Sequence, residues 1–272
     1  MAKGNDGNLL QHTVEIALAR SLAKNADGKL YLVATHGMRP YEPFDDRPTE
    51  SSPSAYKKLE LALRKAREIT KDSHQIPAII NAYIACNASN ARYPNSVELV
   101  RSMLGDVCGC VTEVVEDKAQ VLRQYYDASS ITVLHQSWRT NNGAALLLPD
   151  RLNKPWLLTL DPMTFVESAY QDDDKLRADD LSLIYLRFSD NQAKSSSKGA
   201  IVIACYSMNP RAQRVFKAAI QSHHFPNLRY VETTARGGNR HVAAIGATDS
   251  NISDCAVNEW QNTVQWLDSN SK

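Results

Sequence analysis

Apolar and polar positions follow two patterns along the chain, and these patterns predict strands and helices that alternate. Apolar, β-favouring runs bounded by turn-forming residues predict strands, whereas apolar residues recurring every three or four positions predict amphipathic helices. The predicted strands lie within residues 29–36, 107–114, 130–135, 156–160, 200–206, 228–234 and 241–247. The predicted helices lie within residues 9–24, 54–71, 75–86, 95–104, 117–126, 176–188, 211–222 and 260–267.

The connections between these elements indicate how the strands pair. Helices separate the first five strands, and helical crossovers join strands that run parallel. Only residues 235–240 separate the last two strands, which is too short for a crossover and predicts an antiparallel hairpin. We therefore expect an α/β fold with a Rossmann-like, doubly wound, seven-stranded and mostly parallel sheet. Class I S-adenosylmethionine-dependent methyltransferases have this layout, although a layout alone does not establish a function.

An insertion is predicted after the first strand. Two helical segments, 54–71 and 75–86, precede the helix at 95–104 that leads into the second strand. We interpret residues 45–91 as a small helical insert subdomain. Residues 1–44 and 92–272 would then form the Rossmann-like domain.

Composition narrows the class of protein. The chain has 272 residues, of which 43% are hydrophobic, so it can bury a substantial core, and its net charge of +1 does not indicate a particular partner. The sequence contains no run of 18 apolar residues, which a predicted membrane span would need, and its first residues do not resemble a signal peptide. The five cysteines are scattered without a Cys-x-x-Cys pair, so we expect a cytoplasmic protein with reduced thiols and no metal site.

Polar side chains stand where three predicted strands end. In a doubly wound sheet, the carboxyl ends of the first, second and fourth strands meet at one crevice, which is the usual ligand site. Those ends carry His36, Glu113 and Asp161. An acid ending the second strand can accept hydrogen bonds from ribose hydroxyls, but Glu113 could equally be a solvated acid. His12 and His36 could each be core histidines that are satisfied by hydrogen bonds.

The segment that begins at Asp161 suggests a specific chemistry. Enzymes that methylate an exocyclic amine place Asp or Asn, two prolines and an aromatic residue at this point. The carboxylate and the first proline carbonyl accept the hydrogens of the amine, and the aromatic ring stacks on the base. Asp161 and Pro162 keep the first two elements, whereas Phe165 comes one residue late. An Asp-Pro pair is also a common turn, so a structural role is an alternative.

Charge is unevenly distributed although the total is nearly neutral. Between residues 205 and 241 the chain carries six Arg or Lys residues and one acid, and the predicted helix at 54–71 is also basic. Such surfaces can bind phosphates, but they can equally be solvated faces. The acidic stretch at 172–180 would repel a polyanion.

Several short motifs, in the same order, resemble the RlmJ-type 23S rRNA adenine-N6 methyltransferases. Residues 4–13 resemble the family's N-terminal Gly-Asn-His-Ala-Asp-x-x-Lys-His motif, and residues 30–41 its first strand and loop. Residues 92–96 (Arg-Tyr-Pro-Asn-Ser) resemble a Tyr-Pro-Gly-Ser segment. Residues 111–113 (Val-Thr-Glu) and 160–162 (Leu-Asp-Pro) resemble Leu-Thr-Glu and the start of Ile-Asp-Pro-Pro-Tyr. The helical insert is a family feature too.

This resemblance implies a set of functional residues. The catalytic residue would be Asp161, and Pro162 and Phe165 would contact the substrate. The cofactor would be S-adenosylmethionine, and the acceptor an adenine amine in RNA, with a role in rRNA processing. The implied cofactor-binding residues are His12, His36, Ser96, Glu113, Gln136, Ser137 and Asp161.

The chain also departs from the family pattern. The family's strand-end Asp is Ala34, its Ala-Gly-x-Gly loop is Gly-Met-Arg-Pro at 37–40, and its Asp-Gly pair is Gln136-Ser137. Asp-Pro-Pro-Tyr becomes Asp-Pro-Met-Thr at 161–164, and the Lys before the first histidine is Gln11. Two alternatives therefore stand beside the nucleobase methyltransferase. One is an inactive, methyltransferase-like binding or regulatory protein, and the other is a methyltransferase that acts on a different small molecule.

Overall fold

A computed structural model describes residues 6–24, 26–37, 41–42, 63–68, 76–86, 93–149, 153–162, 164–166, 175–234 and 236–270. Residues 45–62 of the predicted insert and the acidic residues 172–174 lie outside the described residues, as do residues 38–40 and Met163. In the described part of the chain, no helix combines the length and apolarity needed to cross a membrane.

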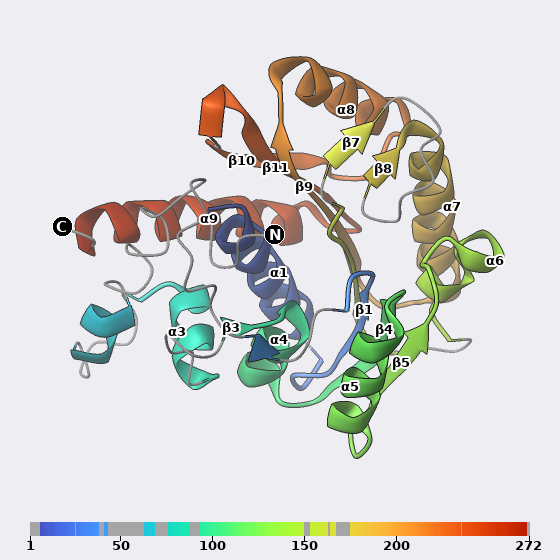
Figure 1. The fold of residues 1–272 in the computed structure, drawn as a ribbon, viewed down its shortest axis with the longest axis horizontal. Helices are drawn as coiled ribbons and strands as arrows, with labels where there is room; N and C mark the ends of the chain where they lie inside the picture. Colours follow the sequence, from blue (N-terminus) through green and yellow to red (C-terminus); the bar gives the residue numbers. More distant parts are fainter. Residues whose placement is uncertain are drawn as a thin grey trace.

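A seven-stranded sheet in the order β10-β11-β9-β6-β1-β4-β5 forms the centre of the fold (Figure 1). The pairs from β5 to β9 are parallel, and β11 is antiparallel to both β9 and β10. The predicted parallel sheet with a terminal hairpin is confirmed. The strands are β1 (Leu30–Ala34), β4 (Val107–Glu113), β5 (Ile131–His135), β6 (Trp156–Leu160), β9 (Gly199–Met208), β10 (Arg229–Thr234) and β11 (Arg240–Ala247).

Helices cover both faces of this sheet (Figure 1). The helices are α1 (Asp6–Ala23), α3 (Ala78–Ala85), α4 (Ser96–Leu104), α5 (Glu116–Tyr126), α6 (Thr140–Gly143), α7 (Ala178–Lys194), α8 (Pro210–Ser222) and α9 (Ser250–Asn270). Short 3-10 turns, η2 (Ala144–Leu146) and η3 (Arg236–Gly238), complete the set together with two small strand pairs. These pairs are β2 (Tyr41–Glu42) with β3 (Tyr93–Pro94), and β7 (Thr164–Val166) with β8 (Lys175–Arg177).

The alternation of side chains along β1 explains why the core has two parts. Successive strand residues point to opposite faces of a sheet. Leu30 and Leu32 join one hydrophobic cluster with α1, α3, α4 and α9, whereas Val33 joins a second cluster with α7 and α8. The central strands are apolar on both faces for this reason, as expected for parallel strands covered by helices.

The described part of the predicted insert shares the main core. Residues 63–68 are helical, and Leu63 and Ala66 are buried. In α3, Ile79 and Tyr83 are fully buried and pack in the same cluster as α1 and α4. Within the described residues, this segment therefore shares a core with the sheet domain, and the insert subdomain at 45–91 stays a prediction.

Two predicted helix boundaries differ from the structure by more than three residues. The last helix starts at Ser250, whereas the sequence predicted a start near residue 260. The earlier start was not predicted because the first three turns bury only a narrow stripe of residues, which includes Ile252 and Ala256. Most of the remaining residues of those turns are polar, so the stripe is hard to recognise in the sequence. Helix α7 likewise continues to Lys194.

Candidate functional site

Four of the predicted site residues line one small pocket at the carboxyl end of the sheet. His12 comes from α1, His36 follows β1, Ser96 begins α4, and Asp161 follows β6. The pocket has a volume of about 10 Å³, which is room for about one water molecule. Its other lining residues are Asn8, Gln11, Ala34, Thr35, Gly37, Asn95, Val97 and Thr159.

Helix α1 supplies buried polar side chains to this site. The Nδ1 atom of His12 lies 2.8 Å from the hydroxyl of Tyr83 in α3, and burial lowers the pKa of His12 to about 3. Glu15, one turn further on, is only 1% exposed. Burial raises the pKa of Glu15 to about 7, against opposing hydrogen bonds from Ser96 and Gln11. His12 is therefore neutral at neutral pH and can both donate and accept a hydrogen bond.

The chain leaving β1 continues beside β4 as far as Gly37. The backbone N–H of Gly37 donates to the carbonyl of Thr112 at 2.9 Å. A Cβ at Gly37 would lie 2.7 Å from the Cδ1 atom of Leu122 and 2.8 Å from the Cγ1 atom of Val111, so a larger residue would force these buried side chains of α5 and β4 to shift. Beside it, the Nδ1 atom of His36 lies 2.8 Å from the hydroxyl of Thr35. Gly37 therefore allows the chain to pack closely against β4 and α5, and His36 beside it lines the pocket.

The N-terminus of α4 is directed at the same pocket. Asn95 caps the helix, because its side-chain oxygen accepts the backbone N–H of Glu98 at 2.9 Å. Ser96 is the first residue of the helix, and Val97 follows it at the pocket wall. The N-terminus of a helix attracts anions through its N–H groups and its dipole. A carboxylate could therefore bind at this end of the pocket.

The other predicted cofactor residues lie at the ends of neighbouring strands, outside the pocket lining. Glu113 ends β4 and is buried, with its Oε1 atom accepting the N–H of Val115 at 2.8 Å. Gln136 and Ser137 follow β5, where the hydroxyl of Ser137 accepts the N–H of Arg139 at 3.1 Å. The strand order places both groups on the β4–β5 side of His36.

The substrate-binding prediction for Phe165 does not fit its position. Phe165 lies in β7, is only 3% exposed, and packs in the core with its ring centroid 5.5 Å from that of Phe216. A ring buried in this way has no open face on which a base could stack. Pro162 is buried as well, whereas Asp161 is half-buried at the pocket.

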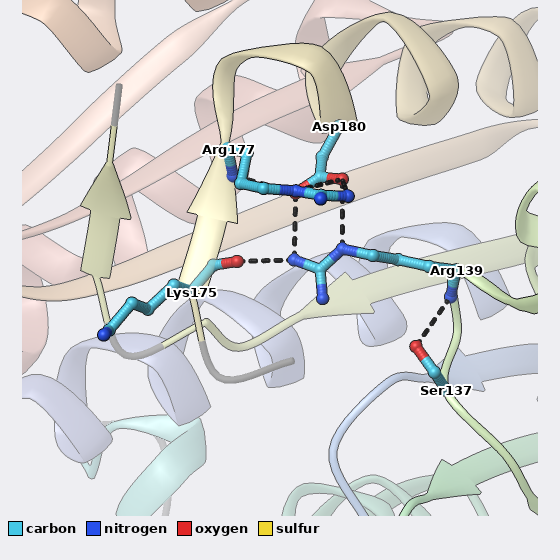
Figure 2. Close-up of polar contacts among 5 residues, drawn as sticks. All are labelled: Ser137, Arg139, Lys175, Arg177 and Asp180. Carbon is cyan, nitrogen blue, oxygen red and sulfur yellow. Dashed lines mark hydrogen bonds and ion pairs between the residues drawn. The ribbon is translucent and has the colours of Figure 1, made fainter. Parts of the chain in front are cut away.

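A buried ion-pair cluster next to the loop after β5 was missed by the sequence analysis. Arg139 and Arg177 both donate to Asp180, which is 2% exposed (Figure 2). Arg139 also donates to the carbonyl of Lys175, and its guanidinium lies 4.3 Å from the centroid of the Trp138 ring. No sequence pattern linked Asp180 to Arg139, which lies 41 positions earlier in the chain.

Tyr206, near the end of β9, was also missed. It is buried, and its hydroxyl donates to the side-chain oxygen of Gln11. Its ring packs edge-on against His241, with 5.6 Å between centroids. An aromatic residue in an apolar strand gives no sequence signal of such a polar contact.

Among the described residues, no group of three His, Cys, Asp or Glu side chains could hold a metal ion.

Protonation of His12 should destabilise the fold. Its folded pKa of about 3 lies below the unfolded value of about 6.5, so the stability contribution is complete above pH 6.5 and is lost as pH falls towards 3. Glu15 acts in the opposite sense, because its raised pKa favours the folded state at lower pH. As the pH falls from 7 to 5, we therefore expect the free energy of unfolding of the wild type to fall by about 2 kcal/mol more than that of a His12→Asn variant. Urea unfolding at both pH values measures this difference.

His224 provides the matched control for this experiment. It is exposed and has a positive φ of 53°, which asparagine tolerates. The His224→Asn variant should follow the wild type at both pH values. Equal pH dependence in the His12→Asn variant and the wild type would show that His12 titrates normally.

Comparison with known proteins supports the fold assignment. No protein-family model and no curated protein matches the sequence. Among solved structures, LPL1258 of Legionella pneumophila, from the family DUF519, has a TM-score of 0.65 at 15% identity, covering 98% of this chain and 95% of its own.

More distant matches bear methyltransferase names. The catalytic domain of hMettl16 in complex with a 3′UTR hairpin has a TM-score of 0.39 at 9% identity, over 86% of this chain and 69% of its own. An rRNA methylase from Streptococcus thermophilus has a TM-score of 0.34 at 7% identity, over 54% of this chain and 80% of its own. The likeness to the Legionella protein shows a shared fold, and the strand order with its antiparallel β11 is that of the Rossmann-like class I methyltransferases.

Proposed function

We propose that this chain is an S-adenosylmethionine-dependent methyltransferase. The observation that supports this most directly is the convergence of His12, His36, Ser96 and Asp161 on one pocket at the carboxyl ends of β1 and β6. These residues lie far apart in the sequence, and the pocket is at the position where open α/β sheets bind ligands.

The chemistry of the residues fits such a cofactor. Glu113, at the end of β4, is placed to accept hydrogen bonds from ribose hydroxyls. The N-terminus of α4, with Ser96, suits a carboxylate, and the neutral imidazole of His12 can donate or accept a hydrogen bond beside it. The ring of His36 lines the same pocket. The cofactor would supply an electrophilic methyl group. The cofactor would also need a wider pocket than the described residues leave, and loop residues 38–40 follow directly after its wall.

Asp161 is the proposed catalytic residue. Its half-buried carboxylate reaches the pocket directly after β6 and can accept a hydrogen from an acceptor amine, which localises the nitrogen lone pair for attack. By resemblance, the acceptor is the exocyclic amine of an adenine in RNA. Because Phe165 is buried, the stacking partner for such a base would have to come from another residue.

Isothermal titration calorimetry with S-adenosylmethionine and S-adenosylhomocysteine tests this function. We expect binding of both with Kd values below the millimolar range. The Ser96→Ala variant tests the site, because Ser96 lines the pocket. The Ser130→Ala variant is its matched control, because Ser130 is exposed and lies just before β5. Only the first variant should weaken binding. Absence of binding of either ligand to the wild type at millimolar concentration would refute the proposed function.

Two observations favour a second candidate, a non-catalytic protein with the same fold. The pocket holds about one water molecule, and Phe165 offers no stacking surface. Such a protein would use the cleft or its basic surface for binding or regulation. The same titration separates the candidates, because the non-catalytic protein should bind neither cofactor nor product.

A further inference from the structure

A cysteine and a lysine meet at the amino ends of the central strands, on the opposite edge of the sheet from the pocket. Cys108 is the second residue of β4, and Lys154 lies just before β6 begins. The Nζ atom of Lys154 lies 3.5 Å from the Sγ atom of Cys108 and donates to it. Neither residue lines the pocket, so this pair is separate from the proposed site of methyl transfer.

The register of the strands explains how these two side chains meet. Strand β1 lies between β4 and β6. Tyr31 of β1 is aligned with Cys108 of β4 on one side and with Trp156 of β6 on the other. The side chain of Lys154 therefore reaches across the start of β1 to contact the sulfur of Cys108. A bond between the two would join β4 to β6 across the strand that separates them.

The sulfur of Cys108 is oriented towards the lysine and accessible to small molecules. Its thiol donates to the backbone carbonyl of Leu30 at 3.6 Å, while the lone pairs of the sulfur accept the N–H of Lys154. Cys108 and Lys154 are both partly exposed, so a small solute can reach them from the solvent. The other cysteines are buried, except Cys255 on α9.

We propose that Cys108 and Lys154 form an oxidisable pair that closes to a covalent cross-link, with a hydroperoxide as the reactant. The sulfur of Cys108 takes one oxygen atom from hydrogen peroxide, which gives a sulfenic acid and one molecule of water. The amine of Lys154, after losing its extra proton to solvent, then attacks the sulfenic sulfur. An S–N bond forms as the S–O bond breaks, and the hydroxyl leaves as water with a hydrogen from the amine. The protein loses two hydrogens in total, and the peroxide is reduced to water.

The cross-link has a chemical consequence for the cysteine. A sulfenic acid that condenses with a nitrogen is protected from further oxidation, whereas an unprotected one proceeds to the irreversible sulfinic and sulfonic acids. A thiol reductant cleaves the S–N bond and restores both side chains. Lys154 would therefore keep the oxidation of Cys108 reversible. This inference does not rest on the proposed methyl transfer, because it concerns two residues outside the pocket and its test measures no methyl transfer.

Peptide mapping by mass spectrometry tests the proposal on the full chain. The wild-type protein is treated with a small excess of hydrogen peroxide, quenched with catalase and digested. We expect a linked pair of peptides that contain Cys108 and Lys154, lighter by about 2 Da than the two peptides together. Dithiothreitol should restore the separate peptides. Oxidation of Cys108 to unlinked acids as the main product in the wild type would overturn the proposal, and this measurement needs no variant.

A Lys154→Arg variant shows whether the amine is the reacting group. Arginine keeps the positive charge and the long stem, but its guanidinium stays protonated and does not attack the sulfur. The linked peptides should disappear, and the Cys108 peptide should gain about 16 Da or a multiple of it. A link from Cys108 that persists in this variant would be a bond to another residue and would overturn the proposal.

Cys255 provides the control within the same digest. It is exposed, and no lysine in the described part of the chain donates to its sulfur. Its peptide should therefore be oxidised to unlinked acids in the wild type and in the Lys154→Arg variant alike. Lysine cross-links at Cys255 as abundant as those at Cys108 would show that the contact with Lys154 has no special role, and would overturn the proposal.

Discussion

Replacing Asp161 with alanine should lower kcat for methyl transfer by about 100- to 10,000-fold, the range expected when a group that assists proton transfer is removed. The carboxylate lies at the pocket directly after β6, where it can hold a hydrogen of the acceptor amine. The Kd for S-adenosylmethionine should stay within a few-fold of the wild type, because Ser96, His12 and His36 remain. Single-turnover kinetics with a radiolabelled methyl group and calorimetry measure the two quantities.

Asp127 gives a matched control for this variant. It is an exposed aspartate just after α5, outside the pocket lining, so Asp127→Ala should retain wild-type kcat and Kd. Full activity in the Asp161→Ala variant would remove Asp161 from the catalytic role. A large loss of cofactor affinity in that variant would instead assign it to cofactor binding.

Replacing Asp180 with alanine should lower the free energy of unfolding by about 3–5 kcal/mol, the usual loss when one partner of a buried ion pair is removed. Asp180 is 2% exposed and accepts hydrogen bonds from Arg139 and Arg177, whose side chains are 14% and 28% exposed. Its loss would leave two largely buried guanidinium groups without their carboxylate. It would also remove the acceptor of the backbone N–H of Arg177, which caps α7. Urea unfolding measures the loss.

The control for Asp180 lies on the same helix. Asp190 pairs with Arg187, but its side chain is 38% exposed, so Asp190→Ala should lower the free energy of unfolding by less than about 1 kcal/mol.

Burial alone would raise the pKa of Asp180, but hydrogen bonds from Arg177 and Arg139 outweigh the effect of burial, and the pKa is lowered. The contribution of the Asp180 carboxylate to the free energy of unfolding is therefore complete above its unfolded pKa of about 4, and it is lost as pH falls through the lower folded pKa. Equal losses in both variants would show that the cluster is not specially stabilising.

The sheet could be predicted because its strands are simple to recognise. Strands such as β6 are apolar on both faces and bounded by turn residues, and the short link between β10 and β11 permits only a hairpin. The convergence of His36 and Asp161 followed from the rule that parallel strands present their carboxyl ends at one edge. The places of His12 and Ser96 at the same pocket came from the resemblance rather than from periodicity.

The missed features depend on contacts between distant segments. The burial of Phe165 results from the three-residue pair β7–β8 packing near α8, and so short a pair has no detectable alternation. The Arg139–Asp180 pair joins residues 41 positions apart, and the contact of Tyr206 with Gln11 spans 195 positions. Local patterns in a sequence do not show which of many polar residues will meet across such distances.

The place of α1 in the fold has a consequence for synthesis on the ribosome. Helix α1, which carries His12 and Gln11, packs against α4 and also against α9, β9 and β11, and these last three are translated more than 170 residues after it. Until those partners leave the exit tunnel, the side chains of α1 that they bury stay accessible to chaperones. Nascent chains stalled before α9 should therefore leave α1 more accessible to protease than it is in the folded protein.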